Sequence, residues 1–96
     1  MIVINSKYVL VAYDIEDNGR RSKIAELLQY YGLARIQYSV FAGEMPARKL
    51  KDMTNTLFDM ELENDDNITI VPICENCKED VKSIKPLPEQ IKHLSI

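Results

Sequence analysis

The feature that most constrains the fold is a nearly continuous apolar run, KYVLVAY, at residues 7–13. Runs of β-branched, aromatic and aliphatic residues of this length are typical of a strand that is buried on both faces. The run ends abruptly at Asp14, which opens the polar cluster DIEDNGRR. We therefore expect an internal strand of a sheet, with Asp14 at its carboxyl end.

An amphipathic helix is predicted directly after this cluster. Its apolar residues recur at the i, i+3, i+4 and i+7 spacing of a helix that buries one face. This stripe consists of Ile24, Leu27, Leu28 and Tyr31. Asp17 or Asn18 can cap the first turn by accepting backbone N–H bonds, and Gly32 supplies a left-handed stop.

Two short strands and a second helix are predicted next. The alternation of apolar residues slips by one position at Phe41, which indicates a bulge or a tight bend between strands at 34–38 and 40–45. Pro46 is in a favoured position to begin the helix. The buried stripe of this helix is expected to consist of Leu50, Met53, Leu57 and Met60.

The last predicted strand covers residues 68–74, and Pro72 places it at a sheet edge or in a bulge. The order strand, helix, two strands, helix, strand is that of an α+β, ferredoxin-like split βαββαβ fold. Its four-stranded antiparallel sheet carries two helices on one face. We expect one domain over residues 1–96, with an N-terminal extension at 1–6 and a C-terminal fifth strand and tail at 78–96. A weak apolar pattern in this last segment consists of Val81, Ile84 and Leu87.

Length and composition fit a small globular protein. The 96 residues suffice for one two-layer core of marginal stability, so self-association would add useful stability. No apolar run reaches the about 20 residues of a transmembrane helix. The opening MIVINS lacks the basic start of a signal peptide. We therefore expect a cytoplasmic protein with no membrane partner.

The charge is distributed unevenly along the chain. The net charge of −3 argues against a generally basic nucleic-acid binder. Residues 1–57, however, hold eight Lys and Arg against six Asp and Glu, whereas residues 58–96 hold four against nine. The first half of the chain can therefore present a basic surface.

Cys74 and Cys77 form a single C-x-x-C motif, which can be a redox pair, half of a zinc site or two incidental small residues. Its late position, after a strand, differs from the thioredoxin arrangement and favours the incidental interpretation. A zinc site would need two more ligands, and the single histidine of the chain is His93. Reduced thiols agree with a cytosolic protein.

Asp14 is the leading candidate for a catalytic or metal-binding residue. A carboxylate at the end of an internal strand is held on rigid backbone and faces the rim of the sheet. Mg²⁺ is commonly held by one or two carboxylates, with water and phosphate oxygens as the other ligands. The alternative is that Asp14 only ends the strand and begins a turn. Glu16 and Asp17 are expected to be solvated, and Tyr13 to point to the opposite face, into the core.

Basic residues in the first turns of the first predicted helix indicate contacts with phosphate. Arg20, Arg21 and Lys23 oppose the helix dipole unless an anion lies nearby. The alternative is a solvated basic face that pairs with neighbouring carboxylates. A basic surface that contacts the phosphate backbone of nucleic acid can extend to Arg35, Arg48, Lys49 and Lys51. Such contacts are independent of base sequence and sensitive to salt.

Three segments together resemble the small CRISPR-associated adaptation protein family, Cas2. They are YVLVAYDIEDNGRR, the helix that ends in YYGL, and RIQYSVFAGE. The resemblance covers residues 7–45 almost without a gap, and the second helix and the strand that ends in P-I-C extend it to residue 77. No phosphate-binding Gly-rich loop and no aromatic RNA-recognition signature competes with it in this sequence.

The resemblance implies a homodimer of ferredoxin-like subunits in which the two copies of Asp14 meet and hold a divalent cation, Mg²⁺ or Mn²⁺. It further implies metal-dependent cleavage of RNA or DNA in spacer acquisition, with the integrase Cas1 as a partner. Positions associated with activity or with the dimer centre are Tyr13, Arg21, Arg35, Ser39 and Phe41, and Lys23 stands where some members have arginine. Two alternatives stay open: a non-catalytic DNA-binding scaffold that bridges integrase dimers, and a stand-alone toxin-like ribonuclease.

Overall fold

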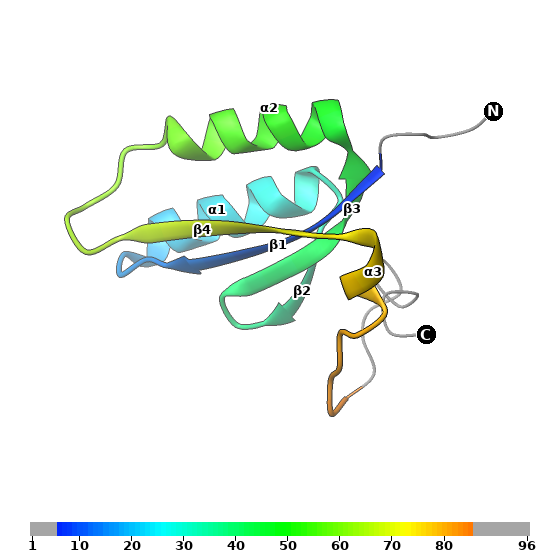
Figure 1. Ribbon diagram of the computed structural model, residues 1–96. Coiled ribbons are helices and arrows are strands. Elements are labelled where there is room, and N and C mark those ends of the chain that lie inside the picture. The colour runs from blue at the N-terminus through cyan, green and yellow to red at the C-terminus, as the bar shows by residue number, and fades with distance from the viewer. Residues whose placement is uncertain (1–5, 86–96) are drawn as a thin grey trace.

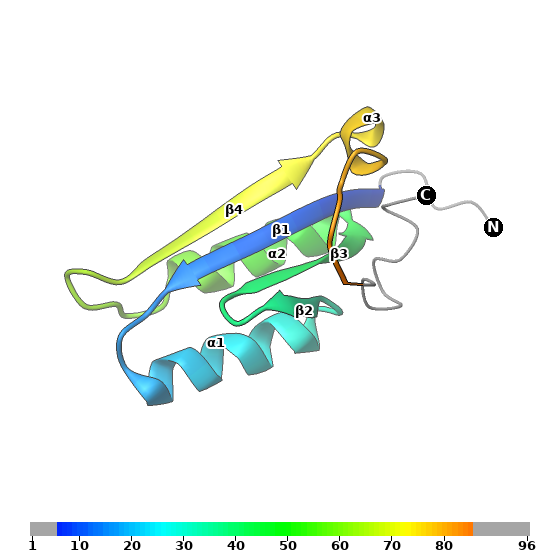
Figure 2. The ribbon, with the colours of Figure 1, turned by 90° about the horizontal axis from the view of Figure 1, so that it is seen from below.

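The computed structural model describes residues 6–85 of the chain. Its elements, in chain order, are β1 (Ser6–Asp14), α1 (Asn18–Tyr30), β2 (Ala34–Gln37), β3 (Val40–Pro46), α2 (Ala47–Phe58), β4 (Asn67–Ile73) and α3 (Glu75–Lys78). The antiparallel sheet has the order β2-β3-β1-β4, and α1 and α2 cover one of its faces (Figures 1 and 2). The predicted ferredoxin-like order is confirmed, as are the internal first strand and the edge position of β4.

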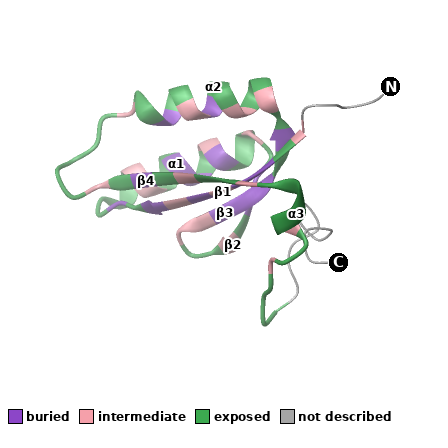
Figure 3. Cartoon of the chain, in the orientation of Figure 1, coloured by how far each residue is buried: buried purple, intermediate pink, exposed green. Residues whose placement is uncertain are grey.

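The core lies between the sheet and the two long helices. Figure 3 shows buried residues along β1, β3 and the two long helices. In β1, Val9 and Val11 are fully buried on this side, and Tyr13 is buried beside them. The largest fully buried side chains that pack around them are Ile24, Leu28, Phe41, Met53 and Leu57. Each contributes about 1.5–3 kcal/mol by leaving water. The two predicted helical stripes are therefore confirmed as the core faces of α1 and α2.

The other face of the sheet carries no long helix within the described chain. Because side chains alternate along a strand, Leu10, Ala12 and Asp14 point to this side. Tyr8 and Ala42 are buried in a small cluster there, against Ile36 and Ile73. α3 lies against the Tyr8 end of this face, where the Lys78 Nζ is 4.3 Å from the centre of the Tyr8 ring (Figure 2). The opposite end, at Asp14, lies away from α3.

Local signals set the ends of the elements as predicted, with small differences. The Asp17 side chain caps α1 by accepting a 2.9 Å hydrogen bond from the Arg20 N–H. Gly32 has a φ of 92°, the left-handed conformation that ends a helix without a Cβ clash. Pro46 occupies the N-cap of α2, so the helix begins one residue later than the expected position.

The chain after β4 forms the short helix α3 and then turns, without a strand, as far as residue 85. The remainder of the predicted fifth strand, including Leu87, lies outside the described residues, as do His93 and most of the predicted N-terminal extension. Within residues 6–85, no helix is long and apolar enough to cross a bilayer.

Candidate functional site

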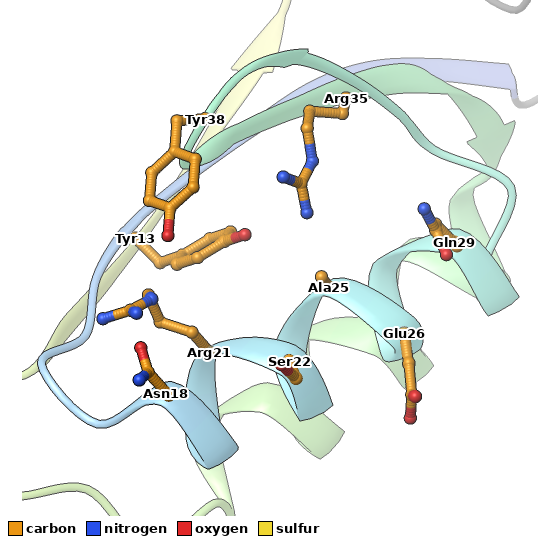
Figure 4. A pocket seen from close by; sticks show the side chains of 9 residues that line it. All are labelled: Tyr13, Asn18, Arg21, Ser22, Ala25, Glu26, Gln29, Arg35 and Tyr38. Carbon is orange, nitrogen blue, oxygen red and sulfur yellow. The ribbon is translucent and has the colours of Figure 1, made fainter.

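An open pocket lies where the end of β1, the start of α1 and the β2–β3 hairpin meet (Figure 4). Its volume is about 430 Å³. The residues that line it are Tyr13, Asn18, Arg21, Ser22, Ala25, Glu26, Gln29, Arg35 and Tyr38. Three predicted site residues, Tyr13, Arg21 and Arg35, are thus brought together from β1, α1 and β2.

Arg21 is held in place by the loop between β1 and α1. Its Nη1 donates hydrogen bonds to the carbonyl oxygens of Ile15, at 3.0 Å, and Glu16, at 2.8 Å. The guanidinium Cζ lies 5.9 Å from the centre of the Tyr38 ring. These contacts fix the loop that follows Asp14, and Arg21 lines the pocket at the loop side, below Tyr13 (Figure 4).

Arg35 approaches the same pocket from the sheet. Its Cζ lies 5.1 Å from the centre of the Phe41 ring and 5.9 Å from that of Tyr38. Arg21 and Arg35 therefore share one aromatic ring, and neither forms an ion pair with a carboxylate of residues 6–85. The carboxylate of Glu26 points away from both (Figure 4). Two guanidiniums that line one pocket without a carboxylate partner favour the binding of an anion.

Tyr13 forms the inner wall of the pocket. Its ring stacks on Phe41, with 6.2 Å between the ring centres. Burial raises the pKa of the Tyr13 phenol. The charges of Arg35 and Arg21 act in the opposite direction, whereas Tyr38 raises the pKa further. The hydroxyl therefore stays protonated near neutral pH and can donate a hydrogen bond to a ligand in the pocket.

Asp14 does not join this pocket. The alternation of β1 directs its exposed side chain to the face opposite Tyr13, beside Asn67 of β4. Within the described chain its carboxylate accepts no hydrogen bond and forms no ion pair. The same residues contain no group of three or more His, Cys, Asp or Glu side chains that could hold a metal ion. One subunit thus offers a single free carboxylate at this position.

Arg20, predicted to contact nucleic acid, links α1 to the loop before β4. Its Nε lies 3.1 Å from the Oδ2 of Asp66, and its Nη1 lies 3.9 Å from Glu63. The Asp66 side chain is 1% exposed. The N–H groups of Glu63 and Glu16 also donate to it, at 3.0 and 3.2 Å. Hydrogen bonding from Glu63, together with the other donors, lowers the pKa of Asp66.

The other predicted residues serve the pocket indirectly or lie apart from it. Phe41 is fully buried beneath Tyr13 and Arg35. The carbonyl oxygen of Ser39, in the β2–β3 turn, accepts a 3.0 Å hydrogen bond from the Tyr13 N–H. Lys23 lines a separate apolar groove between α1 and α2. The basic residues of α2 do not line the pocket either.

Tyr38 belongs to the pocket but was not predicted from the sequence. It lies in the turn between β2 and β3, is 69% exposed and lies near both pocket arginines. The signal that could have found it was an aromatic residue at the tip of a predicted hairpin, three positions after Arg35.

Similarity to known proteins covers most of the chain. The family described as CRISPR associated protein Cas2 matches residues 7–81. The CRISPR-associated endoribonuclease Cas2 of Korarchaeum cryptofilum is 45% identical over 67 residues, which are 70% of this chain and 72% of that protein. A CRISPR-associated endonuclease Cas1/endonuclease Cas2 fusion of Thermoproteus tenax is 46% identical over 50 residues, 52% of this chain and 19% of the fusion. The crystal structure of Streptococcus pyogenes Cas2 is similar with a TM-score of 0.68 and 26% identity, over 81% of this chain and 99% of that one.

Proposed function

Because this chain belongs to the family of CRISPR-associated protein Cas2, we propose that it is a nuclease of CRISPR spacer acquisition, a hydrolase of RNA or DNA phosphodiesters. The observation that carries the proposal is the convergence of Arg21 and Arg35 on the pocket beside Tyr13, where no carboxylate of the described residues pairs with either. Guanidinium groups match phosphate in charge and geometry.

Each pocket residue would make a different contact with a phosphodiester. Arg21 is fixed by two backbone carbonyls and Arg35 by two aromatic rings, so both offer N–H donors from defined positions. Tyr13 adds a protonated hydroxyl. These groups are suited to contacts with phosphate and not to recognition of particular bases. Binding is therefore expected to depend on salt concentration and on the nucleic-acid backbone, and not on the base sequence.

Asp14 is the residue that we propose to hold a divalent cation, Mg²⁺ or Mn²⁺. An exposed carboxylate is the oxygen ligand that such hard cations prefer. When bound, the ion would polarise a phosphodiester and lower the pKa of an attacking water. Asp14 would anchor the ion at the rim of the sheet, and its own carboxylate has no competing bond to break within the described chain.

A homodimer would supply the second carboxylate. The face of the sheet that carries Asp14 also presents apolar side chains, among them Leu10, Ala12 and the 43% exposed Val71. Apposition of two such faces would bury these residues. It would also bring the two copies of Asp14 toward each other.

The alternative is a non-catalytic scaffold that binds DNA for a Cas1 integrase. One of the relatives is a fusion of Cas1 and Cas2 in a single chain, and this fusion favours an association of this protein with Cas1. It needs the basic pocket but not the carboxylate of Asp14. The separation of Asp14 from Arg21 and Arg35 on opposite faces of the sheet makes the two roles separable by mutation.

A cleavage assay with Asp14→Asn decides between them. Labelled RNA and DNA are incubated with Mg²⁺ or Mn²⁺ and wild type, Asp14→Asn or the neighbouring control Glu16→Gln, after dimerisation is checked by gel filtration. The nuclease proposal expects cleavage to fall at least about a hundredfold in Asp14→Asn only, the scale of removing one transition-state interaction. Equal cleavage by all three proteins would refute it. Retained DNA binding without any metal-dependent cleavage would favour the scaffold.

A further inference from the structure

The C-x-x-C motif lies in one turn, at the end of the sheet opposite Asp14. Cys74 precedes α3 as its N-cap, and the Cys77 N–H donates to both the carbonyl oxygen and the Sγ of Cys74, at 3.0 and 3.3 Å. Both side chains are exposed. They are the two cysteines of the sequence, and their exposure leaves both sulfurs accessible to small molecules.

The two thiols have different environments. The Cys77 side chain donates a hydrogen bond to the sulfur of Cys74 and, with the Cys77 N–H, lowers the pKa of the Cys74 thiol. Donation of that bond raises the pKa of Cys77. Among the charged neighbours, Asp80 opposes ionisation of both sulfurs, and Lys78 is engaged by Glu75 and by the Tyr8 ring. Because the Cys77 N–H donates to the Cys74 sulfur at 3.3 Å, we expect Cys74 to be the nucleophilic member of the pair and Cys77 to react second.

We propose that Cys74 and Cys77 are a thiol–disulfide exchange site whose substrates are small-molecule disulfides of the glutathione class. The Cys74 thiolate attacks one sulfur of the substrate disulfide, forms a mixed disulfide and expels one thiolate. Cys77 then loses its proton to solvent, attacks the Cys74 sulfur and expels the second thiolate. The two protein thiols are oxidised by two electrons to a Cys74–Cys77 disulfide, and the substrate is reduced to two thiols.

The arrangement favours exchange over a metal site. The described residues hold no third or fourth side chain of the kind a thiolate-bound metal needs near the pair. The turn is also anchored, because the Lys78 Nζ pairs with Glu75 at 2.6 Å and lies over the Tyr8 ring. Closing the disulfide therefore acts on the point where the chain leaves β4 and crosses the sheet (Figure 2). The inference does not depend on nuclease activity.

The test uses the reduced full-length protein, oxidised glutathione and intact mass spectrometry. Wild type is expected to lose two hydrogens and to retain no glutathione. Cys77→Ser keeps a hydroxyl donor to Cys74 but cannot close the ring, so it is expected to accumulate the mixed disulfide. Cys74→Ser is expected to react severalfold more slowly than Cys77→Ser, because Cys74 receives a hydrogen bond from the Cys77 N–H and Cys77 receives no such backbone donor within the described residues.

A matched variant separates the hydrogen bond from the second thiol. Cys77→Ala removes the donor, so Cys74 in this variant is expected to react severalfold more slowly than in Cys77→Ser. Equal rates for Cys74→Ser and Cys77→Ser, or a wild type that ends as a doubly glutathionylated protein, would overturn the proposal. A further experiment adds Zn²⁺ alone to the reduced protein before oxidation. Stoichiometric binding that blocks oxidation would identify a metal site instead.

Discussion

Phe41 tests whether a residue marked by family resemblance acts on substrate or supports those that do. Its side chain is fully buried, stacks on Tyr13 and lies beneath Arg35. Phe41→Ala would remove the ring and leave a cavity, at a cost of about 3–5 kcal/mol. A small domain is typically stable by only about 5–15 kcal/mol. This variant is therefore expected to be largely unfolded or severely destabilised.

Phe41→Leu is the informative variant, because it keeps an apolar side chain of similar reach. We expect a loss of about 1–2 kcal/mol, which corresponds to a fall in Tm of about 5–15 °C for a domain of this size. Thermal melts followed by circular dichroism measure the fall, and cleavage per folded molecule is then compared. If Phe41 only supports Tyr13 and Arg35, cleavage should stay within about threefold of wild type, a free-energy change below about 1 kcal/mol.

The matched control is Phe58, the second phenylalanine of the chain, which is 68% exposed at the end of α2. Phe58→Ala is expected to change the unfolding free energy by less than about 0.5 kcal/mol. A Phe41→Leu variant that melts like wild type yet loses cleavage would refute a purely supporting role for Phe41. An unfolding free energy for Phe41→Ala no lower than that of Phe58→Ala would also refute it.

Two further predictions concern charged residues. Replacing Arg21 and Arg35 together by Met should weaken binding of single-stranded nucleic acid and reduce the slope of log K against log salt by about 0.7 for each phosphate that the protein no longer neutralises. Arg20→Met, which removes the same charge from an ion pair with Asp66, should leave that slope unchanged in fluorescence anisotropy. Asp66→Asn should lower the Tm at neutral pH. Because the pKa of Asp66 is lowered in the folded protein, chiefly by the Glu63 N–H, its contribution exists above the ordinary carboxyl pKa and is lost on acidification. The melts of wild type and Asp66→Asn should therefore converge below about pH 4.

The order and type of the elements were predictable because each was set by neighbouring residues. The run at 7–13, the stripes of the two helices and the helix stop at Gly32 act within a few positions of the chain, and the structure confirms them. Pro46, predicted to begin the second helix, is its N-cap. The register of β2 against β3 was harder to predict from the sequence. Its irregularity lies between Arg35 and Gln37, and the tight turn at 38–39 follows it.

The candidate site was only partly predictable. The sequence and its family resemblance singled out six residues, and three of them, Tyr13, Arg21 and Arg35, line one pocket. The other three are Asp14, Ser39 and Phe41. The period of two along β1 correctly placed Tyr13 on the face opposite Asp14, but it could not bring Arg21 and Arg35 to the side of Tyr13. The prediction also missed Tyr38, whose signal was a single aromatic residue at the tip of the predicted hairpin.

By itself, the sequence determined the elements, their order and the family, because hydrophobic period and turn chemistry are local properties of the chain. Tertiary structure alone decided which cations are neutralised. Arg20 and Arg21 are adjacent in sequence, yet Arg20 pairs with Asp66, 46 residues away, and Arg21 faces an open pocket. The physical reason is that a charge finds its partner through the packing of distant segments, which no local pattern records.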